Sequence, residues 1–477
     1  MRGPCQSCGV EFDFELLVIG SGPAGQKAAI QAAKARRRVV LVERRRHLGG
    51  VSVNTGTIPS KTIREAIVYL TGLSQRGIYG QDYRLKNEIG IDDLALRTRQ
   101  VVEHERAVIR DQLLRNHVTL LEGDVSFVDP HTVAVVEPSG AERRLSAATV
   151  VVATGSEPAH PPDVAFDGRS ILDSDDIVLR LNRIPRTLVV VGAGVIGVEF
   201  ASMFAALGTK VTVVDGRPGM LDFCDQEIVE ALRFHLRDLG VMFRFGELVT
   251  RVDSHADETL TTLASGKQIA AEAVFYSAGR RGATSRLRLE NAGLEADTFG
   301  RIAVGPTYRT AVDHIYAAGD VIGFPSLAST SSEQGRLASA AACGFDVRPV
   351  GELPFGIFSI PEIGFIGKTE LELTEAAIPY EVGVSYYREL ARGQILGDTH
   401  GLVKLLVSPE DHRLLGIHAL GANATEVIHI GQAVMGLGGT VDFLVESVFN
   451  YPTLAEAYKV AALDALNKLS AVSHLLP

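Results

Sequence analysis

Two stretches of the chain share one pattern of hydrophobic and polar positions. Residues 16–25 read LLVIGSGPAG, an apolar run that ends in a glycine-rich turn, and residues 188–197 repeat this pattern as LVVVGAGVIG. Each turn is followed by helix-compatible residues and a second apolar strand, VVLVE at 39–43 and VTVVD at 211–215. Short apolar runs that alternate with helical segments are typical of parallel sheets. The pattern therefore predicts two βαβ units, 172 residues apart.

Three further apolar runs end in glycine turns of the same kind. TVVVATG at 149–155 follows the first unit, YSAGR at 276–280 closes the second, and HIYAAGD at 314–320 comes after both. We expect the first and third of these segments to be buried strands, and the second to close its unit in a similar way.

The last part of the chain has a different pattern. Residues 401–407 and 414–420 are alternating segments that predict antiparallel strands, and residues 453–469 have the period of a helix. No glycine fingerprint occurs there, so we predict a packing or dimerisation domain.

Composition and charge narrow the class of protein. A chain of 477 residues, 46% hydrophobic and 22% charged, is typical of a globular protein with about three domains. Its formal net charge of −10 gives no basis for binding nucleic acid or an anionic membrane surface. The long apolar run at 188–208 contains Glu199, which a membrane span would have to bury, and no apolar segment follows Met1. We therefore expect a cytoplasmic protein that binds neither membrane nor nucleic acid.

The four cysteines, Cys5, Cys8, Cys224 and Cys343, are too few and too scattered for a disulfide framework. Cys5 and Cys8 have CxxC spacing, but no second pair completes a zinc site. We interpret this pair as a reduced, frayed terminus and assign no metal site; metal binding by the pair is the alternative.

The context of the glycine turns makes them specific, because a lone GxGxxG is weak evidence. Each turn lies between a strand and a helix, and an acidic residue, Glu43 or Asp215, follows the first glycine by 23 positions. Glycines let the backbone approach a pyrophosphate at the positive end of a helix, and the carboxylate binds ribose hydroxyls. Both units are thus predicted to bind dinucleotides; ordinary turns without a ligand are the alternative.

Asp320 could cap a helix or bind a ligand, and the two upstream units favour a ligand.

Together, the two units, the GGVSVNTGTIPSK loop at 49–61, the ATG turn, the AGD motif and the mixed C-terminal part resemble the flavoprotein disulfide reductases from Phe14 to Leu469. The resemblance implies an α/β fold with two Rossmann-like domains and a C-terminal α+β dimerisation domain. It implies FAD in the first unit, NAD(P) in the second, and a homodimer or higher oligomer. The implied parts are an N-terminal tail (1–13), an FAD domain (14–155), an NAD(P) domain (156–280), a central segment completing the FAD pocket (281–350) and an interface domain (351–477).

The resemblance also assigns site residues by position. Glu43 would bind the adenosine ribose, Asp320 would hold the ribityl chain, and Lys61 would lie beside the flavin ring, with Glu199 as its catalytic partner. Without the resemblance, Lys61 is a solvated residue in the first turn of a helix and Glu199 belongs to an exposed helix face. The residues assigned to FAD are Gly20, Gly22, Pro23, Ala24, Gly25, Glu43, Arg44, Gly49, Gly50, Ser52, Thr57, Lys61, Gly123, Thr154, Gly155, Gly319, Asp320 and Ala328. The residues assigned to NAD(P) are Gly192, Gly194, Val195, Ile196, Gly197, Glu199, Asp215, Arg217 and Gly279.

Two departures from the family pattern remove its thiol chemistry. Members that reduce disulfides place two cysteines, five positions apart, where this chain has Ser52 and Thr57, and hydroxyls form neither a disulfide nor a thiolate. Those members also place a histidine before the Pro-Thr of the C-terminal domain, and this chain has Tyr451 there. A phenol keeps its proton up to about pH 10 and is a poor base near neutrality.

A flavin that accepts a hydride and lacks a sulfur acceptor can pass the hydride to a second nicotinamide. Family members that do so share the GTIPSK and NYPT forms seen at 56–61 and 450–453. We therefore expect Si-specific NAD(P)⁺ transhydrogenation with NAD(H) and NADP(H) as substrates, in which NADPH reduces FAD, NADP⁺ leaves and NAD⁺ takes the hydride. Asp215 suits the 2′-hydroxyl of NAD, and Arg217 could reach the 2′-phosphate of NADP, so one site would accept both.

Three other interpretations stay open at this stage. A diaphorase or quinone reductase would pass the electrons to an outside acceptor. A dihydrolipoamide-type disulfide reductase would need the missing cysteines. A non-catalytic FAD-binding scaffold would hold a flavin that NADPH does not bleach.

Overall fold

The computed structural model describes residues 11–80, 82–256, 258–348 and 350–473, and the chain divides into two compact units. The first unit comprises residues 1–59, 99–158 and 280–350, and the second comprises residues 60–98, 159–279 and 351–477. Residues 60–98 thus belong with the second unit, although the predicted 14–155 part includes them. Cys5 and Cys8 lie outside the described residues.

The first unit is built on a sheet in the order β3-β2-β1-β6-β5-β4, with β17 paired to β6. β1 runs parallel to β2 and β6, and β17 also runs parallel to β6, so the predicted βαβ unit and its third strand are confirmed. The elements of this unit are β1 (Phe14–Ile19), α1 (Pro23–Lys34), β2 (Val39–Glu43), α2 (Gly50–Asn54), β3 (Thr119–Glu122), β4 (Asp124–Asp129), β5 (Thr132–Val136), β6 (Glu142–Val152), β7 (Ser156–Pro158), β16 (Arg280–Gly282), η2 (Leu289–Ala292), β17 (Ile315–Ala317), η3 (Asp320–Ile322) and α9 (Ala328–Ala342). Two helices, α3 (Thr57–Thr71) and α5 (Ile91–Arg115), contribute residues to both units.

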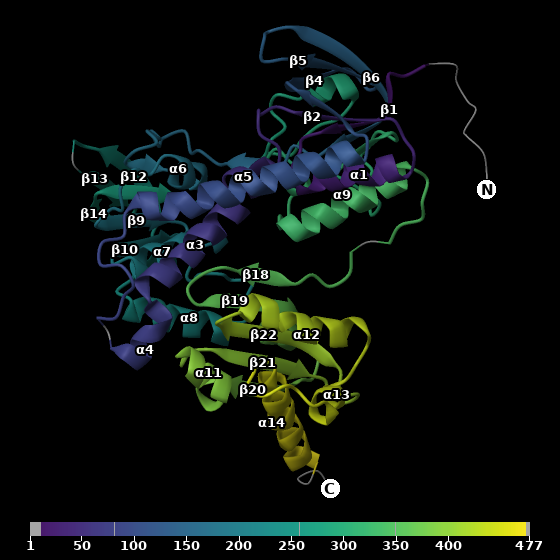
Figure 1. Cartoon of the computed structure of the whole chain (residues 1–477). Helices are drawn as coiled ribbons and strands as arrows, with labels where there is room; N and C mark the ends of the chain where they lie inside the picture. The colour runs from purple at the N-terminus through teal and green to yellow at the C-terminus, as the bar shows by residue number, and fades with distance from the viewer. Residues whose placement is uncertain (1–10, 81, 257, 349, 474–477) are drawn as a thin grey trace. The chain divides into compact units, whose positions relative to one another are not determined.

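β1 is covered on both faces, which explains its continuous apolar run. Successive side chains of a strand point to opposite faces, and Leu16 and Val18 join one hydrophobic cluster while Leu17 and Ile19 join another. The first cluster includes α1 and α9, which lie side by side (Figure 1). Gly335 permits this close packing, because a Cβ there would lie 2.0 Å from the Ala24 carbonyl oxygen.

The second unit contains the other predicted βαβ unit, in a five-stranded sheet ordered β11-β10-β9-β15-β8. One face of β9 packs on α7 and α8, and the other faces the antiparallel sheet β12-β13-β14. The elements before the C-terminal sheet are η1 (Leu73–Gln75), α4 (Arg76–Tyr79), β8 (Ile171–Leu172), α6 (Ser174–Leu179), β9 (Thr187–Val191), α7 (Val195–Ala206), β10 (Lys210–Asp215), α8 (Gln226–Asp238), β11 (Met242–Phe245), β12 (Val249–Ser254), β13 (Thr259–Leu263), β14 (Gln268–Ala271) and β15 (Ala273–Tyr276).

The C-terminal part forms an antiparallel sheet in the order β18-β19-β22-β21-β20, as the alternating pattern predicts. Helices α12 and α14 join one hydrophobic cluster with Val403, Leu405 and Val407 of β21, so these helices share one face of the sheet. The elements are β18 (Phe355–Ile357), β19 (Glu362–Gly367), α10 (Glu370–Glu375), β20 (Glu381–Tyr386), η4 (Tyr387–Glu389), α11 (Ala391–Leu396), β21 (Leu402–Val407), β22 (Leu414–Gly421), α12 (Ala424–Gly436), α13 (Val441–Glu446) and α14 (Glu456–Ser473).

On β21, the fully buried Lys404 joins the sheet to α8 and α10. Its ammonium lies 2.9 Å from carboxylate oxygens of Asp225 and Glu227, and it also pairs with Glu370. Burial alone would lower the pKa of Lys404, but the carboxylates outweigh it and raise that pKa. A buried charge needs such partners, because an unpaired one is strongly destabilising.

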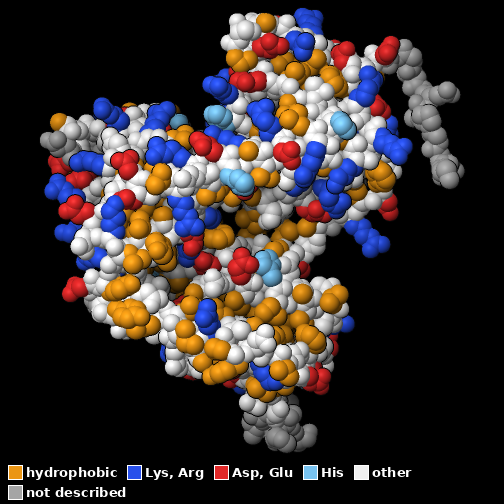
Figure 2. All heavy atoms as spheres, viewed as in Figure 1, with side chains coloured by type: hydrophobic (Ala, Val, Ile, Leu, Met, Phe, Trp, Pro, Cys, Tyr) orange, Lys and Arg blue, Asp and Glu red, His pale blue; other side chains and the backbone are white. Residues whose placement is uncertain are grey.

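Hydrophobic side chains are exposed over the C-terminal sheet and its helices (Figure 2). They include Leu437, Phe443, Val448 and Tyr451, the last with 72% of its surface exposed. Within the described residues, no helix combines the length and the apolar character that crossing a membrane requires.

Candidate functional site

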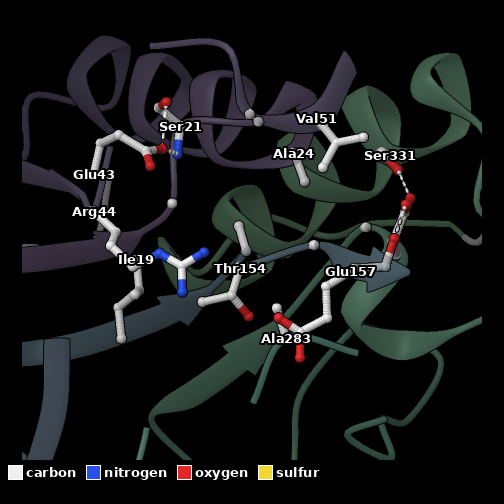
Figure 3. A pocket seen from close by; sticks show the side chains of 18 of the residues that line it. Ile19, Ser21, Ala24, Glu43, Arg44, Val51, Thr154, Glu157, Ala283 and Ser331 are labelled. Carbon is white, nitrogen blue, oxygen red and sulfur yellow. Dashed lines mark hydrogen bonds between the residues drawn. The ribbon is translucent and has the colours of Figure 1, made fainter. Parts of the chain in front are cut away.

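A pocket in the first unit lies at the carboxyl ends of β1, β2 and β6, where the glycine turns gather. Figure 3 shows Glu43 and Ser21 on one side of it and Glu157 and Ser331 on another. Of the residues assigned to FAD, the pocket is lined by Gly20, Gly22, Pro23, Ala24, Glu43, Arg44, Gly50, Ser52, Thr57, Gly123, Thr154, Gly155, Gly319, Asp320 and Ala328. Gly25, Gly49 and Lys61 lie outside this lining.

The first glycine turn brings backbone close to this pocket. Gly20 has a φ of +101°, which favours glycine, and its N–H donates to the Val42 carbonyl at 2.8 Å. The N-cap of α1 is Gly22, which offers no side-chain cap, and the first turn of α1 contains no acidic residue. The N–H groups at this helix terminus can therefore bind an anion.

Gly25 serves packing and not the pocket surface. A Cβ at Gly25 would lie 1.9 Å from the Gly20 carbonyl oxygen, so any side chain would push α1 away from β1. Gly49 is also behind the pocket surface, with a φ of +106° and an N–H that donates to the Ser21 Oγ at 3.0 Å.

The Glu43 carboxylate is held at the end of β2 by the glycine turn. Its Oε2 accepts from the Ser21 N–H at 2.8 Å and from the Ser21 Oγ at 2.6 Å, and its Oε1 accepts from the Arg45 N–H at 2.9 Å. Ser21 and Arg45 also line the pocket, although the glycine fingerprint gave no reason to single them out. The carboxylate is therefore fixed before any ligand binds.

The predicted loop at 49–61 is largely helical, and its residues Gly50, Val51, Ser52 and Thr57, in α2 and at the start of α3, line another side of the pocket. Gly50 approaches Gly22 so closely that a Cβ would lie 2.7 Å from the Gly22 Cα. The Asn54 amide holds the loop by donating to the Leu48 and Gly50 carbonyls at 3.1 and 2.7 Å, and the Asn54 Oδ1 accepts from Arg106. The motifs of the sequence did not single out Asn54, because its partners include backbone carbonyls and the distant Arg106 side chain.

The Asp320 carboxylate lies beside two serine hydroxyl groups that also line the pocket. It accepts from the Ser156 Oγ at 2.8 Å and from the Ser331 Oγ at 3.3 Å. Thr154 also lines the pocket, and its Oγ1 is buried without a hydrogen-bond partner in the described structure. Buried polar atoms are usually paired, so an unpaired hydroxyl on a pocket wall fits a polar ligand.

These features together fit a flavin adenine dinucleotide. The turn and helix terminus suit a pyrophosphate, the Glu43 carboxylate suits a ribose, and Asp320 with Thr154 suits a chain of hydroxyl groups. Apolar side chains such as Ile19 line the pocket beside these polar groups.

The predicted Lys61–Glu199 pair forms within the second unit. The Lys61 Nζ lies 2.9 and 2.7 Å from the two Glu199 carboxylate oxygens. The Glu199 side chain is only 5% exposed and that of Lys61 is 25% exposed, so neither has the solvated position that the bare sequence favoured. Lys61 lies in the first turns of α3.

A segment far away in the sequence holds this pair. The Phe358 N–H donates to the Glu199 Oε1 at 2.8 Å, and the Lys61 Nζ lies 4.9 Å from the centre of the Phe358 ring. Two residues on, the Ile360 N–H donates to the Ser202 Oγ at 3.0 Å, one turn after Glu199 on α7. Sequence reasoning missed Phe358, because no local pattern links it to residues about 160 and 300 positions earlier.

The second glycine turn repeats the geometry of the first. Gly192 has a φ of +106°, Gly194 caps α7 without a side-chain cap, and a Cβ at Gly197 would lie 1.9 Å from the Gly192 carbonyl oxygen. Val195 and Ile196 occupy the first turn of α7, and Gly279, with a φ of +103°, follows β15.

Asp215 stands at the end of β10 as Glu43 stands at the end of β2. Its Oδ2 accepts from the Ala193 N–H at 2.6 Å, and its Oδ1 accepts from the Arg217 N–H at 2.8 Å. Burial acts to raise the pKa of Asp215, but hydrogen bonds from Arg217 and from the Ala193 backbone lower it overall. Asp215 is therefore ionised at neutral pH.

No cysteine lies among the described residues that line the pocket of the first unit. Cys224 is buried on the way to α8, and burial raises the pKa of its thiol; Cys343 follows α9. Ser52 and Thr57 both line the pocket, so hydroxyl groups stand where the sequence comparison placed the two family cysteines.

The chain matches family models over most of its length. A model described as pyridine nucleotide-disulphide oxidoreductase matches residues 14–335, and one described as the dimerisation domain of these proteins matches residues 353–462. The chain therefore belongs to the pyridine nucleotide-disulphide oxidoreductase family, which binds FAD and uses pyridine nucleotides. The predicted fold class and the predicted family are both confirmed.

Within this family, the chain is similar to proteins with one name. It is 59% identical over 463 residues to the soluble pyridine nucleotide transhydrogenase of Mycobacterium bovis (strain BCG / Pasteur 1173P2), covering 97% of this chain and 99% of the relative. It is 42% identical to the protein of that name from Colwellia psychrerythraea (strain 34H / ATCC BAA-681), covering 96% and 99%. The predicted enzyme class, a flavoprotein oxidoreductase, is confirmed.

Two solved structures resemble the fold of this chain over nearly its whole length. LpdA from Mycobacterium tuberculosis superimposes with a TM-score of 0.87 at 27% identity, covering 94% of this chain and 99% of that one. The HOCl-induced flavoprotein disulfide reductase RclA from Escherichia coli gives a TM-score of 0.84 at 27% identity, covering 94% and 99%.

Proposed function

We propose that this chain transfers hydride from NADPH to NAD⁺ through bound FAD, in the cytoplasm and as a homodimer. The carrying observation is that a pocket suited to FAD has hydroxyls at Ser52 and Thr57 and no cysteine among its described lining residues. The names of the similar proteins support the same activity. The dimerisation domain matched at 353–462 supports the homodimer.

In this proposal the first unit binds FAD, largely through residues 14–155 and 281–350. The glycine turn and the N-terminus of α1 receive the pyrophosphate, Glu43 accepts hydrogen bonds from the adenosine ribose, and Asp320 binds the ribityl hydroxyls. When bound, FAD supplies the group that accepts a hydride from one nicotinamide and gives it to another.

The second unit binds NAD(P) through residues 156–280 of the chain. Its glycine turn at 192–197 receives the dinucleotide pyrophosphate, and Asp215 and Arg217 lie at the adenosine ribose. The Lys61–Glu199 pair provides a fixed positive and negative charge within the second unit. Fixed charges of this kind stabilise charge that develops during a transfer.

The test mixes the purified, FAD-loaded protein with NADPH and a thio-substituted NAD⁺ analogue, and follows the absorbance of the reduced analogue. We expect the reduced analogue to form at a steady rate, and expect that rate to exceed the rate with a soluble quinone in place of the analogue.

If NADPH bleaches the flavin but only the quinone is reduced, the protein is a diaphorase and the proposal is wrong. Turnover of lipoamide would likewise contradict it, since no cysteine lies among the described residues that line the pocket. A flavin that NADPH leaves oxidised would indicate a non-catalytic scaffold.

A further inference from the structure

The carboxylate at the end of β10 has its hydrogen-bonding capacity filled by the chain itself. Besides the Ala193 and Arg217 backbone N–H groups, Asp215 accepts from the Arg217 guanidinium, with Nε 3.1 Å from Oδ1 and Nη2 2.9 Å from Oδ2. An ionised carboxylate offers about four acceptor positions. A ribose hydroxyl therefore finds no free position on Asp215 while the guanidinium stays in place.

The first unit differs at this point, although its backbone geometry is the same. Among the described residues, Glu43 accepts three hydrogen bonds, from the Ser21 N–H, the Ser21 Oγ and the Arg45 N–H. The guanidinium of Arg45 makes none of them. One acceptor position of Glu43 is thus open to a ribose, whereas the equivalent position of Asp215 is occupied by an arginine side chain.

Arg217 has a second acidic partner within reach. Its Nη1 lies 3.2 Å from the Oδ1 of Asp222, in the segment that leads from β10 to α8. The side chain of Asp222 is 65% exposed and that of Arg217 is 44% exposed, so the guanidinium can turn without disturbing the core. The Asp215 side chain, by contrast, is only 9% exposed, and the Ala193 and Arg217 backbone N–H groups hold its two carboxylate oxygens.

We propose that Arg217 changes partner with the dinucleotide bound, and that Asp222 determines the balance between NAD and NADP. This inference rests on the proposed function, in which both dinucleotides use the second glycine turn. With NAD, the ribose hydroxyls replace the guanidinium on Asp215, and the guanidinium pairs with Asp222 alone. With NADP, the 2′-phosphate takes the guanidinium, in the bidentate geometry that arginine favours.

Asp222 then acts with opposite sign on the two dinucleotides. It provides a place for the displaced guanidinium when NAD is bound, and its negative charge opposes a 2′-phosphate of roughly two negative charges. Since exposed charges interact weakly, the effect of Asp222 is expected to be small but of known direction.

The experiment measures the dissociation constants of NAD⁺ and NADP⁺ for the FAD-loaded protein by titration of flavin absorbance, without turnover. In Asp222→Asn, we expect NADP⁺ to bind roughly 3-fold more tightly and NAD⁺ no more tightly than in the unchanged protein. In Arg217→Met, we expect NADP⁺ binding to weaken by roughly 10-fold or more and NAD⁺ binding to be unchanged or stronger.

The matched control is Arg251→Met, which removes another exposed arginine of the same unit from its pair with Asp253 at 2.7 Å. It should change neither constant. Equal weakening of both dinucleotides by Arg217→Met, or an unchanged ratio in Asp222→Asn, would overturn the proposal while leaving the proposed function intact. If the unchanged protein binds only one of the two dinucleotides, the proposed function fails and the partner exchange fails with it.

Discussion

At the scale of single residues, the sequence predicts where the charged residues at the strand ends lie, but it does not predict which distant residues hold charged side chains in position. The spacing from each first glycine locates Glu43 and Asp215 correctly at strand ends, because the βαβ geometry fixes where the next strand stops. It cannot locate Phe358 or Asp222. Phe358 reaches Glu199 only through tertiary structure, and Asp222 lies in a segment without regular periodicity.

The Phe358 ring gives a prediction about the Lys61 ammonium. Phe358→Leu keeps the backbone N–H that Glu199 accepts, but it removes the aromatic face 4.9 Å from the Lys61 Nζ. A cation over an aromatic ring is worth about 0.5–2 kcal/mol. We expect the rate of flavin reduction by NADPH, measured by stopped flow, to fall by roughly 2- to 30-fold.

Phe358→Tyr is the matched control, because it keeps the aromatic face and should keep most of the rate. FAD content and thermal midpoint should be unchanged in both variants. An equal loss of rate in the tyrosine variant would indicate that side-chain packing, and not the ring face, sets the position of Lys61.

At the scale of elements, the sequence predicts the repeated strand–turn–helix units because their signal is local. The C-terminal strands and α14 follow from alternation and helical period in the same way. The assignment of Gly25 and Gly49 to ligand contact stays a prediction. Gly25 and Gly49 lie outside the pocket lining, since one supports the contact of α1 with β1 and the other shapes the loop behind Ser21.

Substitutions at two glycines of the second turn should have different effects, one on nucleotide binding and the other on stability. A Cβ at Gly194 meets nothing within 4 Å, whereas one at Gly197 would lie 1.9 Å from the Gly192 carbonyl oxygen. We expect Gly194→Val to keep the thermal midpoint and bound FAD but to weaken NAD⁺ and NADP⁺ binding by at least roughly 10-fold, because its bulk occupies the pyrophosphate position.

Gly197→Ala should instead lower the thermal midpoint, as α7 must move from β9. Calorimetry and nucleotide titration of both variants provide the comparison. Loss of FAD from the Gly194 variant would mean that the two units have been assigned the wrong way round.

At the scale of the whole molecule, local patterns do not predict how the chain is divided. Residues 60–98 lie between two parts of the first unit in sequence and yet belong to the second. This division depends on which core buries Ala66, Ile67 and Leu94, and periodicity reports only that such residues are buried. The predicted boundaries at 155, 280 and 350 remain predictions.

The stability of the molecule should depend on His235 of α8. Its ring nitrogens are buried without hydrogen-bond partners in the described structure, and its ring meets His400 edge-on at 4.7 Å. Burial, followed by the charge of His400, lowers the pKa of His235 to about 4, and Asp398 and Asp238 oppose the shift only in part. The unfolded chain therefore binds a proton more readily than the folded protein between about pH 6.5 and pH 4.

Because of this difference in proton binding, the free energy of unfolding decreases as the pH falls. The contribution of neutral His235 is fully present above about pH 6.5, and it decreases as the pH falls toward 4, by about 3 kcal/mol in total. His235→Leu should reduce the loss of stability between pH 7.5 and pH 5, measured by denaturant unfolding at both values. The exposed His255→Leu is the control and should leave that loss unchanged; an unchanged loss in His235→Leu would show that other groups carry it.

The two carboxylates at the strand ends also imply different residence times for their ligands. At Glu43 a ribose can take an open acceptor position, so binding breaks no existing bond and the return of a competing side chain does not promote release. In the proposed function, a ribose that binds at Asp215 must displace the Arg217 guanidinium, which can then return to its place. Under the proposed function, we therefore expect the first copy of the repeat to retain its ligand through many cycles and the second to release its ligand after each one.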